Sequence, residues 1–198
     1  MTADWTSAIE RARTCAPFLA RGLDRMPALE ALLAAGSGEA ALAWARAAGQ
    51  GAPDLGAALR RERLALATAL AVGDLAGAFP LAQVMAELSD LADRALDQAI
   101  ADAVTRRVPD AEPAGFLALA LGKHGARELN YSSDIDPILL YDPERLPRRA
   151  RDDPGEAAQN YARTLMDLLT RQTGDGFVFR VDLRLRPASE VRDRKSVV

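Results

Sequence analysis

Two short stretches of this chain carry acidic residues at a spacing suited to metal-dependent chemistry. In the first, Gly122 to Tyr141, one residue separates Asp134 from Asp136 on an expected strand. Alternate side chains of a strand point to the same side, so the two carboxylates would lie roughly 6–7 Å apart with room for a divalent ion. The Asp-Ile-Asp segment therefore predicts a metal site.

A glycine-rich turn precedes this acidic pair. Gly122 and Gly125 allow the backbone to turn tightly and to aim its N–H groups at an anion. Lys123 and Arg127 add positive charge nearby. The segment indicates a phosphate cradle beside the metal. The supporting hydroxyls, which bind phosphate or only shape the turn, are Ser132 and Ser133.

The second stretch, Phe177 to Pro187, supplies a third carboxylate, Asp182. Three carboxylates are what a two-Mg²⁺ site for phosphoryl or nucleotidyl transfer needs. Read with a period of two, the stretch has an apolar back and a charged front. Next to the first stretch, that front would present Asp182 among guanidinium groups suited to phosphate oxygens. The charged front comprises Arg180, Asp182, Arg184 and Arg186.

Each of these patterns also has a simpler structural interpretation. Asp134 and Asp136 could cap a turn or helix, since Ser-Ser-Asp is a common capping composition. The alternation of Arg180 and Asp182 could be the solvent face of a strand with paired charges, and for Arg186 that interpretation is nearly as strong. The site hypothesis therefore depends on the two stretches lying together.

The two stretches together resemble the bacterial glutamine synthetase adenylyltransferase/adenylyl-removing enzymes, within the DNA polymerase beta-like nucleotidyltransferase superfamily. The first block runs from Gly122-Lys123 through Arg-Glu-Leu-Asn to Ser132-Ser133-Asp134-Ile135-Asp136. The second is Arg180 to Pro187, RVDLRLRP. Two blocks in the expected order are specific, whereas either alone would be weak. The stretch Glu87 to Asp93, ELSDLAD, adds a fainter likeness.

The resemblance implies an activity. The sequence of the first block is similar to that of the N-terminal half of such enzymes. In the family, that half uses phosphate to remove AMP from a tyrosine of glutamine synthetase and releases ADP. A C-terminal half, absent here, adds AMP from ATP. The resemblance also implies Mg²⁺ as cofactor, ATP, ADP and phosphate as substrates or products, and glutamine synthetase and a PII-type signal protein as partners in nitrogen regulation.

The chain departs from the family pattern at three positions. His124 stands where an apolar residue is usual, and Ala126 where glycine is usual, which predicts a strained or altered turn if φ is positive there. Pro137 follows the acidic pair, and because proline donates no hydrogen bond to a sheet, it predicts an edge, a bulge or an altered Asp136 geometry.

Two other classes of function remain open from the sequence. One is a generic nucleotidyltransferase that acts on another acceptor. The other is an inactive docking module, because the chain resembles only the first part of family members and its charged tail, Arg192 to Val198, shows no continuation of the pattern. We expect a truncated chain.

Composition narrows the remaining classes. The net charge is −3 and the pI about 5.3, which argues against a general nucleic-acid partner. The single cysteine, Cys15, excludes a multi-cysteine zinc site and is expected to be a buried small residue. Apolar runs such as Phe116 to Leu121 are too short to span a bilayer. We expect no membrane partner and a cytoplasmic location.

The fold expected from the pattern is α+β. Residues 1–112 read as a helical bundle rich in alanine and leucine, residues 113–188 as a nucleotidyltransferase-type mixed sheet with flanking helices, and residues 189–198 as a truncated tail. The expected strands are Phe116 to Leu121, Asp134 to Tyr141 and Phe177 to Leu185, with a helix from Glu156 to Thr170 before the last. The intervening loop, Asp142 to Pro154, carries Arg148, Arg149 and Arg151, either a solvated charge run or a contact for a substrate protein.

Overall fold

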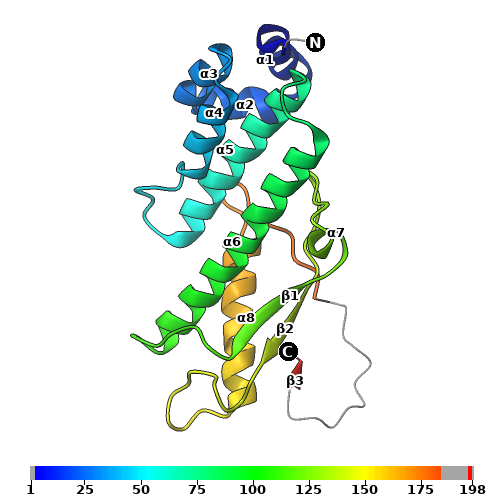
Figure 1. Ribbon diagram of the computed structural model, residues 1–198. Coiled ribbons are helices and arrows are strands. Elements are labelled where there is room, and N and C mark those ends of the chain that lie inside the picture. Colours follow the sequence, from blue (N-terminus) through cyan, green and yellow to red (C-terminus); the bar gives the residue numbers. More distant parts are fainter. Residues whose placement is uncertain (1–2, 184–195, 198) are drawn as a thin grey trace. The chain divides into compact units, whose positions relative to one another are not determined.

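A computed structural model describes residues 3–183 and 196–197 (Figure 1). The chain divides into two compact units, Met1–Leu88 and Ser89–Val198, here called unit 1 and unit 2. The division falls inside the longest helix, α6 (Leu81–Arg107), upstream of the change in sequence pattern near residue 112. Each unit is described by itself.

Unit 1 is a helical bundle in which α5 makes contacts with each of the four shorter helices. Alanine and leucine side chains fill its interior, including Ala8, Leu42 and Leu66, none of which is exposed. Two helices begin at aspartate caps: Asp4 accepts from the Ser7 N–H and Asp54 from the Ala57 N–H. The bounds are α1 (Trp5–Cys15), α2 (Pro17–Arg25), α3 (Pro27–Ala34), α4 (Gly38–Arg46) and α5 (Leu55–Leu75).

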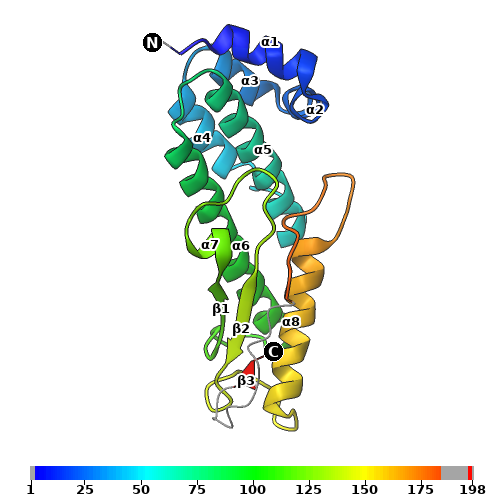
Figure 2. The same cartoon turned by 90° about the vertical axis from the view of Figure 1, so that its right-hand side faces the viewer.

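Unit 2 combines the rest of α6 with a small sheet and two further helices (Figure 2). The sheet has the order β1-β2-β3 with antiparallel pairing, and Phe116 of β1 lies opposite Tyr141 of β2. The expected combination of helices and strands is thus confirmed. The bounds are β1 (Phe116–Ala120), α7 (Gly122–Gly125), β2 (Pro137–Tyr141), α8 (Pro154–Thr170) and β3 (Ser196–Val197).

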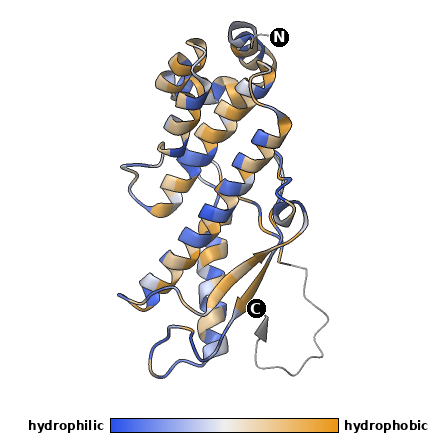
Figure 3. Cartoon of the chain, in the orientation of Figure 1, coloured by the Kyte–Doolittle hydropathy of each residue, from blue (hydrophilic) through white to orange (hydrophobic). Residues whose placement is uncertain are grey.

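Helix α8 packs against the sheet through a row of large side chains. The rings of Phe116 and Tyr161 meet edge to face with centroids 5.7 Å apart. Tyr161, Leu165 and Leu169 are all buried, as the helical period predicts. Figure 3 shows the resulting alternation of apolar and polar positions along the helices. This packing fixes the sheet in which the first motif block connects β1 to β2.

Two expected strands differ from those observed. The first begins at Pro137 instead of Asp134, because proline can start a strand but cannot donate inside one. The second, expected over Phe177 to Leu185, is no strand within its described part, residues 177–183, where Val181 forms a single isolated bridge. The predicted helix is confirmed and begins two residues early, where Asp153 caps the Gly155 and Glu156 N–H groups.

Cys15 was expected to be buried, and that expectation is wrong. It is the last residue of α1 and is exposed, with its Sγ 3.5 Å from Thr14 Oγ1. Cys15 follows Ala8 and Ala12 at helical spacing on the same face of α1, so its exposure comes from its place at the C-terminal end of the helix. Within residues 3–183 and 196–197, no helix has the length and apolar content needed to cross a bilayer.

Candidate functional site

The two motif blocks lie side by side in unit 2. Ile135 and Val181 form a parallel bridge in which the Ile135 N–H donates to the Arg180 carbonyl and the Asp182 N–H donates to the Ile135 carbonyl, both at 3.0 Å. Side chains alternate along both segments, so this register pairs Asp134 with Arg180 on the face away from Ile135, and Asp136 with Asp182. The register therefore brings Asp136 and Asp182, which are 46 residues apart in sequence, next to each other.

Arg180 is hydrogen-bonded within this group. Its Nε donates to Asp134 Oδ1 at 2.6 Å, and its Nη2 donates to the Ser132 carbonyl at 2.5 Å. About half of each side chain in the ion pair is exposed, 58% for Arg180 and 50% for Asp134. This cross-segment pair fits the simpler interpretation of the charged front, paired charges on a solvent face, as far as Arg180 is concerned. The Arg180 guanidinium therefore occupies the place beside the Asp134 carboxylate where a bound metal ion would lie.

Asp136 faces the glycine turn. Its Oδ2 lies 3.4 Å from the position that a Cβ would take on Gly122, whose φ is +55°. The Gly-Lys turn and the acidic pair are thus neighbours, as the sequence predicted. Across the described ranges, no three or more acidic, histidine or cysteine side chains converge closely enough to form a ready-made metal cluster.

The glycine turn is a single helical turn, α7, closed by a Schellman motif. The Arg127 N–H donates to the His124 carbonyl at 2.9 Å and the Glu128 N–H to the Lys123 carbonyl at 2.7 Å. The left-handed position of this motif falls on Arg127, with φ +59°, a conformation that usually favours glycine. Of the two outcomes expected at Ala126, strain is absent, because Ala126 has a right-handed φ of −81°.

Gly125 is required by a close approach inside the same turn. A Cβ at this position would lie 2.6 Å from the Ala120 carbonyl oxygen, well inside van der Waals contact. The first glycine of the motif thus serves backbone conformation and the second serves packing. Together they hold the exposed Lys123 between β1 and the acidic segment.

Helix α6 anchors this turn through two aspartates that were not predicted as site residues. Asp93 Oδ1 lies 2.8 Å from Nε2 of His124, whose side chain is buried. Asp90 and Asp93 both accept from Arg127, and the hydrogen bond to Asp90 is the main cause that raises the pKa of the Arg127 guanidinium. Both aspartates belong to the stretch Glu87 to Asp93, ELSDLAD. The faint family likeness of that stretch was therefore the signal in the sequence that could have indicated them.

Arg127 is consequently committed to α6 in this structure. Its two carboxylate partners compete with any phosphate for the same guanidinium donors. The predicted role of Arg127 in phosphate binding stays a prediction, and it requires a rearrangement of these ion pairs. Lys123, in contrast, is exposed on the turn.

The two serines shape the approach to Asp134. Ser133 Oγ accepts from the Asn130 N–H and donates to Asn130 Oδ1, both at 3.0 Å. The Ser132 N–H donates to the same Asn130 oxygen at 3.1 Å. This hydrogen-bonded turn satisfies the Ser133 hydroxyl locally. Two other predicted phosphate ligands, Arg184 and Arg186, lie outside the described residues.

Comparison with known proteins places the chain among nucleotidyl-transferring enzymes. Residues 9–191 match the glutamate-ammonia ligase adenylyltransferase family. The bifunctional glutamine synthetase adenylyltransferase/adenylyl-removing enzyme of Xanthobacter autotrophicus is 45% identical over 141 residues, 66% of this chain and 14% of that protein. The enzyme of the same description from Brucella suis biovar 1 is 37% identical over 207 aligned positions, 93% of this chain and 20% of that protein.

The chain therefore belongs to the glutamate-ammonia ligase adenylyltransferase family, and the resemblance inferred from its two blocks is confirmed. A relative from Caulobacter vibrioides is 44% identical over 140 residues, again 14% of its own length. The chain spans only about a seventh to a fifth of these curated relatives.

Proposed function

We propose that this chain carries the adenylyl-removing site of its family, a nucleotidyltransferase-type core within residues 113–188. The reaction would be Mg²⁺-dependent phosphorolysis of adenylyl-tyrosine on glutamine synthetase. The observation that carries the proposal is the Ile135–Val181 bridge, which brings Asp182 alongside the Asp134 and Asp136 segment. Sequence likeness alone would leave the two blocks unconnected.

The donor set fits magnesium by chemical type. Mg²⁺ prefers carboxylate oxygens and keeps several waters, so partly exposed aspartates suit it. Asp134, Asp136 and Asp182 would hold it, with Asp134 exchanging the Arg180 guanidinium for the ion. Bound there, Mg²⁺ would neutralise charge on the phosphate oxygens, and a two-ion site is the arrangement we favour.

In the proposed reaction an oxygen of inorganic phosphate attacks the α-phosphorus of the adenylyl group in line with the tyrosine oxygen. The new P–O bond gives ADP, the bond to tyrosine breaks, and the phenolic oxygen leaves and takes up a proton. A phenol with a pKa near 10 leaves far more readily than an alkyl alcohol, so little acid–base help is required from the protein.

The remaining residues would bind and orient the phosphates. Lys123 would contact phosphate oxygens from the exposed end of the turn, next to the backbone N–H groups of α7. Arg180, once released from Asp134, would become a second cation on the same side. Arg127 would bind phosphate only after its ion pairs with Asp90 and Asp93 open. Ser132 and Ser133 would hold the loop, and Arg184 and Arg186 would extend the charged front.

The wider setting belongs to the same proposal. Glutamine synthetase would be the protein substrate and a PII-type protein the regulator, in the cytoplasm. ATP-dependent adenylylation would belong to the C-terminal part of the longer relatives. Support for these assignments comes from family membership and from the likeness of the first block to the N-terminal half of family members.

The test is ADP release from adenylylated glutamine synthetase incubated with this chain, Mg²⁺ and phosphate. We expect ADP only when both phosphate and Mg²⁺ are present, and at least a hundredfold loss in the Asp134→Asn/Asp136→Asn variant, in line with losing charge stabilisation in a transition state. Asp97→Asn, an exposed aspartate on α6, is the matched control. Release of AMP instead of ADP would replace phosphorolysis with hydrolysis, and release that persists in the double variant would refute the site.

A further inference from the structure

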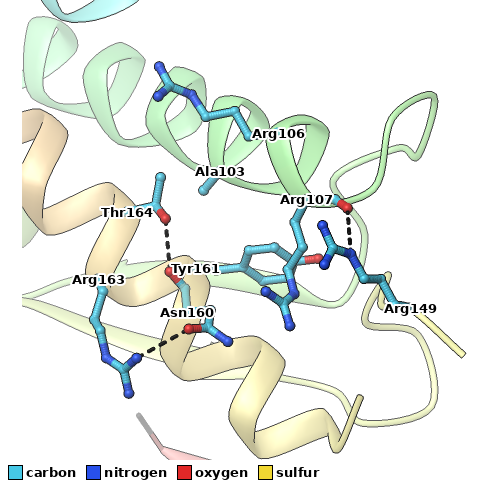
Figure 4. A pocket seen from close by; sticks show the side chains of 8 residues that line it. All are labelled: Ala103, Arg106, Arg107, Arg149, Asn160, Tyr161, Arg163 and Thr164. Carbon is cyan, nitrogen blue, oxygen red and sulfur yellow. Dashed lines mark hydrogen bonds between the residues drawn. The ribbon is translucent and has the colours of Figure 1, made fainter. Parts of the chain in front are cut away.

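Four arginines are among the residues that line a cavity of unit 2. The cavity has a volume of about 290 Å³ and lies between the C-terminal end of α6, the loop before α8 and the middle of α8 (Figure 4). Arg106 and Arg107 come from α6, Arg149 from the loop and Arg163 from α8. Four arginines from three elements thus line one cavity, with the buried Tyr161 among them, and the Arg106 side chain extends away from the other three.

The acidic residues near this cavity do not balance its charge. Arg107 is paired with Asp152 at 2.7 Å and Arg106 with Asp102 at 2.7 Å. The other two arginines have only neutral acceptors within the described ranges. Arg149 donates to the Arg107 carbonyl at 3.4 Å, and Arg163 donates to the side-chain oxygens of Asn160 and Gln159 at 3.2 and 3.4 Å. Two positive charges therefore remain without an ionic partner.

The chemistry of the walls restricts the ligand. Asn160 uses its Oδ1 to accept from Arg163, which leaves its NH₂ group as a further donor. The lining is polar in its larger part, so the cavity suits a compact anion better than an aliphatic chain. Arginines from three elements can offer N–H donors to several oxygens of a tetrahedral phosphate, whereas a planar carboxylate is satisfied by one fork.

This cavity is separate from the proposed nucleotidyl site. Asp93, which holds the glycine turn, and Arg107, which lines the cavity, lie about 14 residues apart on α6, roughly 21 Å along the helix axis. An anion bound among the arginines would therefore not touch Asp134, Asp136 or Lys123. Its binding would instead bridge α6, the loop and α8.

We infer that the cavity among Arg106, Arg107, Arg149 and Arg163 is a binding site for a small multivalent phosphate compound, distinct from the site at the acidic blocks. The uncompensated Arg149 and Arg163 supply the charge, and Arg107 and Asn160 supply directed donors. The ligand would add to the links that already join the three elements: the Arg107–Asp152 pair, the hydrogen bond from Arg149 to the Arg107 carbonyl, and the Tyr161 hydroxyl, which donates to the Pro147 carbonyl at 2.6 Å.

The test is calorimetric titration of the chain with pyrophosphate at low ionic strength and without Mg²⁺. We expect wild type to bind and Arg149→Ala/Arg163→Ala to bind at least about tenfold more weakly, because two charge-assisted contacts are lost. Arg21→Ala/Arg151→Ala removes the same net charge from exposed positions outside the cavity and should change affinity less than twofold. Arg149→Lys/Arg163→Lys keeps the charge without the forks and should fall between.

Several results would overturn the inference. Equal weakening in both double alanine variants would mean that only net charge matters. Loss of binding in Lys123→Ala with retention in Arg149→Ala/Arg163→Ala would place the anion at the glycine turn. Tighter binding of citrate than of pyrophosphate would make the site one for carboxylates. Circular dichroism of each variant checks that it is folded, which the exposure of Arg149 and Arg163 favours.

Discussion

Arg180 and Asp134 form an ion pair with Nε 2.6 Å from Oδ1, which joins the two motif blocks across 46 positions of sequence. In the proposed site Asp134 must exchange this guanidinium for a metal ion. In that proposal the pair would compete with the ion, and its strength would set part of the metal affinity.

Arg180→Ala should raise the affinity of the chain for Mg²⁺ in the absence of nucleotide. Exposed pairs of this kind contribute about 0.2–1 kcal/mol, which corresponds to at most about a fivefold change in Kd. Calorimetric titration with Mg²⁺ measures it. Arg171→Ala, which breaks an exposed pair with Asp167 on α8, is the control and should leave the Kd unchanged. Weaker Mg²⁺ binding in Arg180→Ala would mean that the guanidinium orders the ligands instead of competing with the ion.

Gly125→Ala should destabilise the glycine turn. The added Cβ would lie 2.6 Å from the Ala120 carbonyl oxygen, and both atoms belong to rigid elements. We expect a loss of about 1–3 kcal/mol in the free energy of unfolding, measured by circular dichroism in urea. Gly174→Ala, where the added Cβ meets nothing within 4 Å, should show no loss. Equal stabilities of the two variants would contradict the packing role of Gly125.

Asp93→Ala should leave the buried imidazole of His124 without its acceptor and should also remove one partner of Arg127. Loss of a buried hydrogen bond of this kind costs about 1–3 kcal/mol. The exposed Asp97 on the same helix provides the comparison, since its replacement by alanine should change stability by no more than about 0.5 kcal/mol. The measurement is the midpoint of urea unfolding for both variants. Equal midpoints for the Asp93 and Asp97 variants would show that His124 is held by packing alone.

Tyr161→Phe should reduce stability at neutral pH and do so less at alkaline pH. The phenol donates to the Pro147 carbonyl, a bond that contributes about 0.5–1.5 kcal/mol. Burial raises the pKa of Tyr161 above its ordinary value of 10.0. Because the folded pKa is the higher one, this contribution is complete below about pH 10 and falls as pH rises through the folded pKa.

The measurement is the difference in free energy of unfolding between wild type and Tyr161→Phe at pH 7 and near pH 11. The account predicts that the difference shrinks at the higher pH, since phenylalanine has no proton to lose. A difference that is constant across this range would show that the Tyr161 phenol titrates alike in the folded and unfolded chain.

The sequence predicted local elements well where a single period dominates. The expected strand from Phe116 and the helix to Thr170 were found within one or two residues of their predicted bounds, because one buried face repeats along each. The site hypothesis required the second block to lie beside the first, and the Ile135–Val181 bridge meets that condition. The form of that contact was different, since Pro137 prevents the strand from extending back to Asp134.

The anchoring of the glycine turn could not be predicted in the same way. His124 and Asp93 are 31 residues apart, and nothing in local periodicity links a helix position to a turn. The left-handed residue of the turn was equally hidden, because Arg127 occupies a position that usually favours glycine. Both features depend on tertiary contacts with α6.

The central claim is that two separate blocks build one metal and nucleotide site, and Mn²⁺ binding followed by electron paramagnetic resonance in the presence of ADP tests it most directly. The account predicts that Asp136→Asn and Asp182→Asn each weaken Mn²⁺ binding at least about tenfold, while the exposed control Asp97→Asn binds like wild type. If Asp182→Asn bound Mn²⁺ as tightly as wild type while Asp136→Asn did not, the second block would lie outside the site and the account would be wrong.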